Sequence, residues 1–223
     1  MLADRPFLDR LDDTDRDALL GRLTQRSHPR GGMVISVSEQ GRDVFFIVEG
    51  RAQAILHSRD GKAVGYRDMG PGDMFGELAA IDGQPRSASI IALDQTKVGR
   101  LSFADFQDLV NSHPSIAWVL MTHMSTQIRR MTGRIFEYST LLVRERLIRE
   151  LIRLAGEDGT DNTSSQISPA PTHFFLASRI STHREAVSRE MSSLAKQGLL
   201  EKRAGVLHLR NLETLRALCP EED

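Results

Sequence analysis

Residues 70–93 decide the fold and read GPGDMFGELAAIDGQPRSASIIAL. Gly76 lets the backbone approach a ligand closely, and a short helix that opens at Glu77 presents free N–H groups that favour an anion. Arg86 offers a planar fork for two phosphate oxygens, and Ser87 adds a hydroxyl donor. Glu77 is also an acceptor for a sugar hydroxyl. The stretch has the parts of a small phosphate site; from these residues alone, a surface Arg-Ser pair that binds nothing is the alternative.

The stretch also resembles the phosphate-binding cassette of the cyclic-nucleotide-binding domain. That cassette has the pattern F-G-E-L and, further on, P-R-S/T/A-A; this chain has FGEL from position 75 and PRSA from position 85. The resemblance implies that Gly76 and Glu77 hold the ribose 2′-hydroxyl, and that Arg86 and Ser87 hold the cyclic phosphate. It therefore predicts the following cyclic-nucleotide-binding residues: Gly76, Glu77, Leu78, Arg86, Ser87, Ala88, Met131 and Thr132.

Short apolar runs separated by glycine-rich turns flank this stretch on both sides. The runs expected to be strands are Met33–Val37, Val44–Val48, Ala52–Leu56, Ala63–Tyr66, Ser87–Leu93 and Val98–Leu101. Strands of this length with this density of turns predict an antiparallel sandwich or barrel. Residues 4–26, which precede them, are predicted to form short helices. We therefore expect an α+β chain whose residues 1–114 form a jelly-roll-like, antiparallel β-barrel domain that binds a cyclic nucleotide.

A long helical segment follows the barrel. Residues 115–154 contain no proline, and their apolar side chains recur at spacings of three, four and seven. This pattern predicts one long helix, or two helices with a break near Gly133 or near Ser139-Thr140. A helix longer than about 20 residues usually packs along a partner. We therefore predict that residues 115–137 form a dimerisation helix and that the chain is a homodimer.

The resemblance also places the base of the nucleotide near polar side chains of this helix. In the cyclic-AMP receptor protein family a Thr-Ser pair lies there, and here Met131 and Thr132 take those places, so the first hydroxyl is missing. Thr132 is then the best candidate to meet the base, while Ser87 can also donate to a guanine edge. Cyclic AMP is the expected ligand, and cyclic GMP is an alternative or additional one.

Residues 172–200 predict a helix-turn-helix within a domain spanning residues 138–223. Two helices are expected over residues 172–179 and 183–197, followed by a hairpin around Arg203-Ala204-Gly205 and a last helix near 211–218. The side chains expected to form the core of the motif are Phe175, Leu176, Ile180, Val187, Met191 and Leu194. Thr182 and Glu185 have the spacing of a capping box, which predicts that the second helix begins there.

Charge is concentrated on this C-terminal segment. Seven Lys and Arg residues against three Glu residues between positions 172 and 212 give a local charge of +4 in a chain of net charge −1. Such a patch favours contact with DNA phosphates, although a winged module that contacts proteins is the alternative. The run REAVSR from position 184 resembles the recognition helix of the cyclic-AMP receptor protein (CRP/FNR-type) family. The resemblance implies double-stranded DNA as partner and these DNA-contacting residues: Thr182, His183, Arg184, Glu185, Ser188 and Arg189.

Other functions find little support in the sequence. The seven histidines are scattered, none forms an HExxH spacing, and no nucleophile elbow or P-loop is present, so we expect neither catalysis nor a bound metal. Cys219 is the single cysteine, no secretory signal is visible, and no apolar run reaches membrane length, which together favour the cytoplasm. We therefore predict a cyclic-nucleotide-responsive transcription regulator. Ligand binding in the N-terminal barrel is expected to enable the homodimer, allosterically, to bind a palindromic, TGTGA-like DNA site, and RNA polymerase is a further expected partner. The alternative is a cyclic-nucleotide-binding module that acts on a protein partner.

Overall fold

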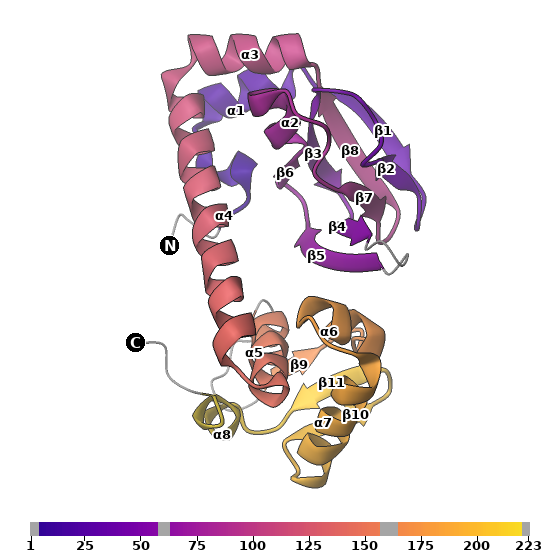
Figure 1. Cartoon of the computed structure of the whole chain (residues 1–223). Coiled ribbons are helices and arrows are strands. Elements are labelled where there is room, and N and C mark those ends of the chain that lie inside the picture. The colour runs from indigo at the N-terminus through magenta and orange to yellow at the C-terminus, as the bar shows by residue number, and fades with distance from the viewer. Residues whose placement is uncertain (1–4, 58–62, 157–164, 220–223) are drawn as a thin grey trace. The chain divides into compact units, whose positions relative to one another are not determined.

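The computed structural model describes residues 5–57, 63–156 and 165–219 (Figure 1). The chain divides into two compact units, Met1–Arg130 and Met131–Asp223, and each unit is described by itself. The boundary lies inside one long helix, whereas the sequence predicts a division into residues 1–114, 115–137 and 138–223. None of the helices in the described part of the chain is long and apolar enough to cross a membrane.

The first unit is built on two four-stranded antiparallel sheets, with strand orders β1-β8-β3-β6 and β2-β7-β4-β5. The strands are β1 (Thr24–His28), β2 (Met33–Ile35), β3 (Val44–Glu49), β4 (Ala52–His57), β5 (Ala63–Met69), β6 (Met74–Phe75), β7 (Ser89–Ala92) and β8 (Thr96–Leu101). A 3-10 helix precedes them at Phe7–Arg10, and the α-helices are α1 (Asp13–Leu20), α2 (Glu77–Asp82), α3 (Phe103–Ser112) and the start of α4 (Pro114–Thr140). The predicted antiparallel β fold is confirmed.

Two apolar clusters hold this unit together. One lies between the two sheets and includes Ile47, Phe75 and Val98. The other joins the opposite face of the first sheet to the helices, with Phe46 packed among side chains from the N-terminus, α3 and α4. Because Ile116 and other side chains of the first turns of α4 belong to this second cluster, the start of the long helix is part of the sandwich unit.

One prediction for this unit is wrong. Residues 4–26 were expected to be helical to their end, but Thr24–His28 form strand β1, which pairs with β8. The segment TQRSH has no apolar alternation, and four of its five residues are exposed. Its strand conformation comes from the backbone ladder with β8, which a pattern of side chains does not reveal.

The second unit contains the end of α4 and a winged helix-turn-helix. Its further elements are α5 (Val143–Gly156), β9 (Ser165–Ile167), α6 (His173–Arg179), α7 (Arg184–Lys196), β10 (Leu200–Arg203), β11 (Val206–Leu209) and α8 (Leu212–Ala217). Strands β10, β11 and β9 form an antiparallel sheet. Helix α4 runs unbroken through Gly133, and the break before α5 follows Ser139-Thr140. Residues 157–164, which follow α5 in the chain, lie outside the described residues.

Candidate functional site

Gly76 is the N-cap of helix α2 and has a backbone conformation that few other residues adopt. Its φ is +81°, in the left-handed region, and it precedes Glu77 at the start of α2. A Cβ placed on Gly76 would lie 2.8 Å from Nη1 of Arg86 and 3.1 Å from the carbonyl oxygen of Asp43. Glycine is therefore required both by the backbone conformation and by the space that the Arg86 side chain occupies.

Arg86 is buried and held by two backbone carbonyls. Its Nη1 donates to the Gly76 carbonyl at 2.9 Å, and its Nη2 donates to the Asp43 carbonyl at 3.0 Å. Only 5% of the residue is exposed, and its Nε is buried without an acceptor among the described residues. Burial lowers the pKa of Arg86, and the charges of Glu39, Asp43 and Glu77 oppose that shift. Arginine nevertheless stays protonated in proteins, so the site holds a cation whose Nε–H is buried without an acceptor among the described residues.

Glu77 places a buried acceptor beside this cation. It is 6% exposed, and burial raises its pKa, while Arg67, its own backbone N–H and Arg86 act in the opposite direction. Ser87 is exposed and Ala88 is buried, while Leu78 is 40% exposed on α2. The structure thus brings Gly76, Glu77 and Arg86 together, with the other three cassette residues next to them in the chain.

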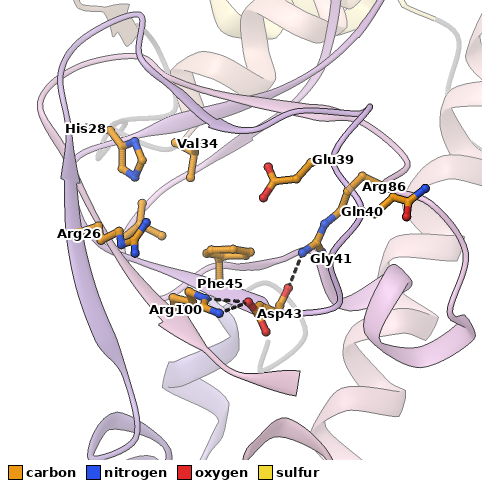
Figure 2. Close-up of a pocket in the computed structure, with 11 residues that line it drawn as sticks. Arg26, His28, Val34, Glu39, Gln40, Gly41, Asp43, Phe45, Arg86 and Arg100 are labelled. Carbon is orange, nitrogen blue, oxygen red and sulfur yellow. Dashed lines mark hydrogen bonds and ion pairs between the residues drawn. The ribbon is translucent and has the colours of Figure 1, made fainter. Parts of the chain in front are cut away.

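A cavity of about 330 Å³ opens between the strands of the first unit, and Arg86 reaches into it (Figure 2). Its described lining consists of Arg26, His28, Val34, Glu39, Gln40, Gly41, Asp43, Phe45, Arg86, Val98 and Arg100. Asp43 fixes this wall, because its carboxylate pairs with Arg100 at 2.5 Å and accepts from the Phe103 amide at 3.0 Å. The sequence prediction missed Asp43, since a residue that holds an arginine through its main-chain carbonyl leaves no side-chain signal.

Met131 and Thr132 lie on α4 in the second unit, and both are exposed. Their predicted contact with the base of a nucleotide remains a prediction.

The helix-turn-helix has the predicted core but not the predicted cap. Leu176, Ile180, Val187 and Leu194 are buried, and Phe175 and Met191 pack against them. Helix α7 begins one residue later than the capping box requires: its N-cap is His183, which makes no side-chain cap hydrogen bond. The Thr182 amide instead donates to the Ala177 carbonyl at 3.0 Å. Thr182 therefore closes helix α6, and the capping-box prediction is wrong.

The residues predicted to contact DNA surround the start of α7. His183, Arg184, Glu185 and Arg189 are exposed, and Thr182 and Ser188 are half-buried. The Ser188 hydroxyl lies 2.7 Å from Nδ1 of His173 on α6, so it is already used within the motif.

The β10–β11 hairpin forms the wing beside this motif. It turns at Ala204 and Gly205, both with positive φ, and exposes Lys202 and Arg203. The second unit thus presents two basic elements, the start of α7 and the wing.

Comparisons with known proteins match both units. The family model described as cyclic nucleotide-binding domain matches residues 25–113, and the Crp-like helix-turn-helix domain matches residues 145–218. The cAMP-activated global transcriptional regulator Vfr of Pseudomonas aeruginosa is 26% identical over 188 residues, covering 82% of this chain and 88% of Vfr. The cyclic AMP receptor protein of Thermus thermophilus is 24% identical over 215 residues, covering 96% of both chains.

Solved structures share the fold. The c-di-GMP responsive global regulator CLP of Xanthomonas campestris superimposes with a TM-score of 0.79 at 19% identity, covering 90% of this chain and all of that one. A CooA mutant from Carboxydothermus hydrogenoformans superimposes with a TM-score of 0.80 at 19% identity, covering 96% of each chain. With both domains matched and relatives that span most of the chain, the protein belongs to the CRP/FNR family of ligand-responsive, DNA-binding transcription regulators and is not an enzyme.

Proposed function

We propose that the effector of this regulator is a cyclic nucleotide whose phosphate binds at Arg86. The observation that carries the proposal is the buried Nε of Arg86, which has no acceptor among the described residues while both Nη atoms are held in place. A buried donor without a partner costs free energy, and an anion that accepts from it recovers that cost. Gly76 leaves room for the guanidinium and for a ligand beside it, and Ser87 adds a hydroxyl.

Cyclic AMP is the first choice of ligand, and cyclic GMP is the alternative. Two relatives that span most of the chain are named for cyclic AMP, whereas CLP, which has the same fold, is named for c-di-GMP. The buried carboxylate of Glu77 suits the 2′-hydroxyl of a ribose, a group shared by both mononucleotides. Thr132 and Ser87 are the residues expected to select between the two bases.

We also propose that two copies pair along α4. Exposed apolar side chains recur on this helix and continue into the turn after it, with spacings of three and seven; they are Trp118, Met121, Ile128, Ile135 and Leu142. These spacings repeat as the a and d positions of a heptad, the pattern of a helix that packs along a partner helix. Exposed fractions between 53% and 71% leave this stripe uncovered in a single chain, and a second copy would bury it.

For the DNA target we propose a palindrome of two TGTGA-like half-sites, read by the exposed N-terminal residues of α7. Arginine favours guanine and glutamate favours cytosine in the major groove, and Arg184, Glu185 and Arg189 supply both types. A binding selection from random duplexes tests this proposal, and an unrelated half-site would contradict it.

RNA polymerase in the cytoplasm is the expected further partner.

The competing proposal, a module that acts on a protein partner, has less support. The second unit matches a Crp-like helix-turn-helix domain over residues 145–218, and both its wing and the start of α7 expose basic side chains. Both features favour DNA as the partner.

Titration calorimetry of the purified protein with cyclic AMP, and separately with cyclic GMP, tests the ligand. We expect binding of at least one nucleotide, and loss of that binding in Arg86→Ala. A suitable control is Arg51→Ala, because Arg51 is an exposed arginine of the same unit whose ion pair with Asp94 spans 3.1 Å. Absence of binding for both nucleotides would reject the cyclic-nucleotide proposal and leave the family membership intact.

A further inference from the structure

The last residue of α6, Arg179, is held from two sides by other helices of the second unit. Its Nε is paired with the carboxylate of Glu150 on α5. Its main-chain carbonyl accepts from the Tyr138 hydroxyl on α4 at 2.9 Å and from Nη1 of Arg134 at 3.5 Å. Arg179 is 8% exposed and Glu150 is 1% exposed, so this pair is removed from water.

Both carboxylate oxygens of Glu150 form ion pairs in a larger cluster of charged side chains. One of its oxygens meets Arg179, and the other meets Arg153 and Arg134. Arg153 also donates to Glu137 on α4 at 2.9 Å. Buried charges are tolerated when they are paired and hydrogen-bonded in this way, and such a cluster has a strict geometry. The three helices α4, α5 and α6 are therefore joined at one point.

That point lies just before the turn into the recognition helix. Four residues separate Arg179 from Arg184, the first residue of α7, and the turn is closed by the bond from the Thr182 amide to the Ala177 carbonyl. Ile180 is 2% exposed, and Ser181 has a φ of +53°, so the turn has little freedom to adjust. The direction in which α7 leaves the turn is then set by the position of Arg179.

We propose that Arg179 is a positioning residue for DNA recognition, and that Tyr138 and Glu150 act through it. Arg179 is buried and presents no group to DNA. By fixing the end of α6 it holds the first turn of α7 at the angle that its side chains need to meet base edges. Since Tyr138 lies on α4, the same contact ties the recognition helix to the long helix. This proposal rests on DNA binding by the helix-turn-helix and not on the identity of the effector.

The positioning role predicts a loss of sequence discrimination and not a general loss of DNA binding. Base contacts depend on orientation within the groove, whereas contacts with phosphates tolerate small rotations and carry no sequence information. Tyr138→Phe removes one hydroxyl and leaves the ring. Losing one neutral hydrogen bond corresponds to roughly a fivefold effect.

The experiment compares the wild type, Tyr138→Phe and Thr140→Val by fluorescence anisotropy, with and without cyclic AMP. The two probes are the duplex that the wild type selects from a random pool and a scrambled duplex of the same length. Thr140→Val is the matched control, because among the described residues the Thr140 hydroxyl donates only to the Phe136 carbonyl of its own helix, at 2.8 Å. We expect Tyr138→Phe to bind the selected duplex about fivefold more weakly. Its affinity for the scrambled duplex and its salt dependence should not change, and Thr140→Val should match the wild type.

Equal losses on both duplexes, or no loss on either, would overturn the proposal. Amide hydrogen exchange tests the positioning role of Arg179 even if the wild type does not discriminate between duplexes. The amides of Ala186 and Val187 bond to the His183 carbonyl in the first turn of α7, at 3.1 and 3.3 Å. Their hydrogen exchange should be faster in Tyr138→Phe than in the wild type and unchanged in Thr140→Val. Unchanged exchange in Tyr138→Phe would likewise overturn the proposal.

Discussion

At the scale of single residues, the ligand site depends on how Arg86 is held before a ligand arrives. Two neutral carbonyls fix its Nη atoms, and a glycine with positive φ leaves space beside them. The sequence motif predicts that these residues meet, because the FGEL and PRSA segments are read as one cassette. It does not predict Asp43, which contributes a backbone carbonyl from a distant loop, or the free Nε that results from this geometry.

Glu39 is expected to weaken phosphate binding at this site. It lines the same cavity as Arg86, and Figure 2 shows its carboxylate pointing into that cavity. Among the carboxylates that raise the pKa of Arg86, Glu39 has the largest effect. An entering phosphate meets the negative charge of Glu39 as well as the positive charge of Arg86. Glu39→Gln should therefore bind the cyclic nucleotide about two- to fivefold more tightly, a modest effect because Glu39 is exposed to solvent.

Calorimetry at low and high salt checks this prediction. The increase in nucleotide affinity caused by Glu39→Gln should become smaller as the salt concentration increases, because an exposed charge is screened. Glu49→Gln is a matched control, since the Glu49 side chain is 69% exposed and pairs with Lys97 away from the cavity. Equal or weaker binding by Glu39→Gln would contradict the prediction.

We predict that His123 on α4 makes the fold of the first unit sensitive to acid. It is 2% exposed, its ring packs edge-on against Phe7, and neither ring nitrogen has a hydrogen-bond partner in the described residues. Burial lowers the pKa of His123 to about 4, and the nearby charges of Arg67, Arg10 and Arg130 act in the same direction. The folded chain therefore favours the neutral ring.

The pH dependence of stability follows from this shift. The folded-state pKa of His123 lies below its unfolded value of 6.5. The stability that the neutral His123 ring contributes to the folded state is therefore fully present above pH 6.5, and it decreases as the pH falls toward 4. The full difference corresponds to about 3 kcal/mol. Urea unfolding at pH 7 and pH 5 should show a smaller loss of stability in His123→Leu than in the wild type. The same loss in both proteins would show that other groups cause the acid sensitivity.

At the scale of elements, α4 carries the apolar stripe along which we propose that two copies pair. Ile128 is 62% exposed on this stripe, and a charge placed there would be buried without a partner in a paired helix. Ile128→Asp should therefore convert the proposed dimer to monomers in analytical ultracentrifugation and leave the melting of each unit nearly unchanged. Gln127→Asp, one residue away and off the stripe, should remain a dimer. A wild-type protein that sediments as a monomer would reject the pairing.

Elements with apolar periodicity were predictable from the sequence, and those made by backbone pairing or turn geometry were not. The long helix and the two helices of the DNA-binding motif follow their apolar patterns, and so do strands β2, β3, β4, β5, β7 and β8. Strand β1 is polar, and β6 has only two residues, so neither leaves a pattern. The capping box failed because the Thr182 amide is used to end α6. The ionic cluster around Glu150 also escaped prediction, since arginines and glutamates at helical spacing are usually solvent-exposed.

At the scale of the whole molecule, we propose that occupancy of the first unit by its ligand changes DNA binding by the second. Helix α4 belongs to both units, since the boundary at Arg130 and Met131 falls within it. A ligand shifts DNA binding only as far as it binds the DNA-competent state more tightly, and DNA then raises the affinity for the ligand by the same factor.

The most direct test measures the affinity of the wild type for its selected duplex by anisotropy, without ligand and with saturating cyclic AMP or cyclic GMP, alongside Arg86→Ala. We predict that one nucleotide raises the affinity for the selected duplex by about 5- to 150-fold, the usual range of allosteric coupling. Arg86→Ala should keep the ligand-free affinity and lose the response. Equal affinity with and without either nucleotide, in a protein that calorimetry shows to bind it, would contradict the account.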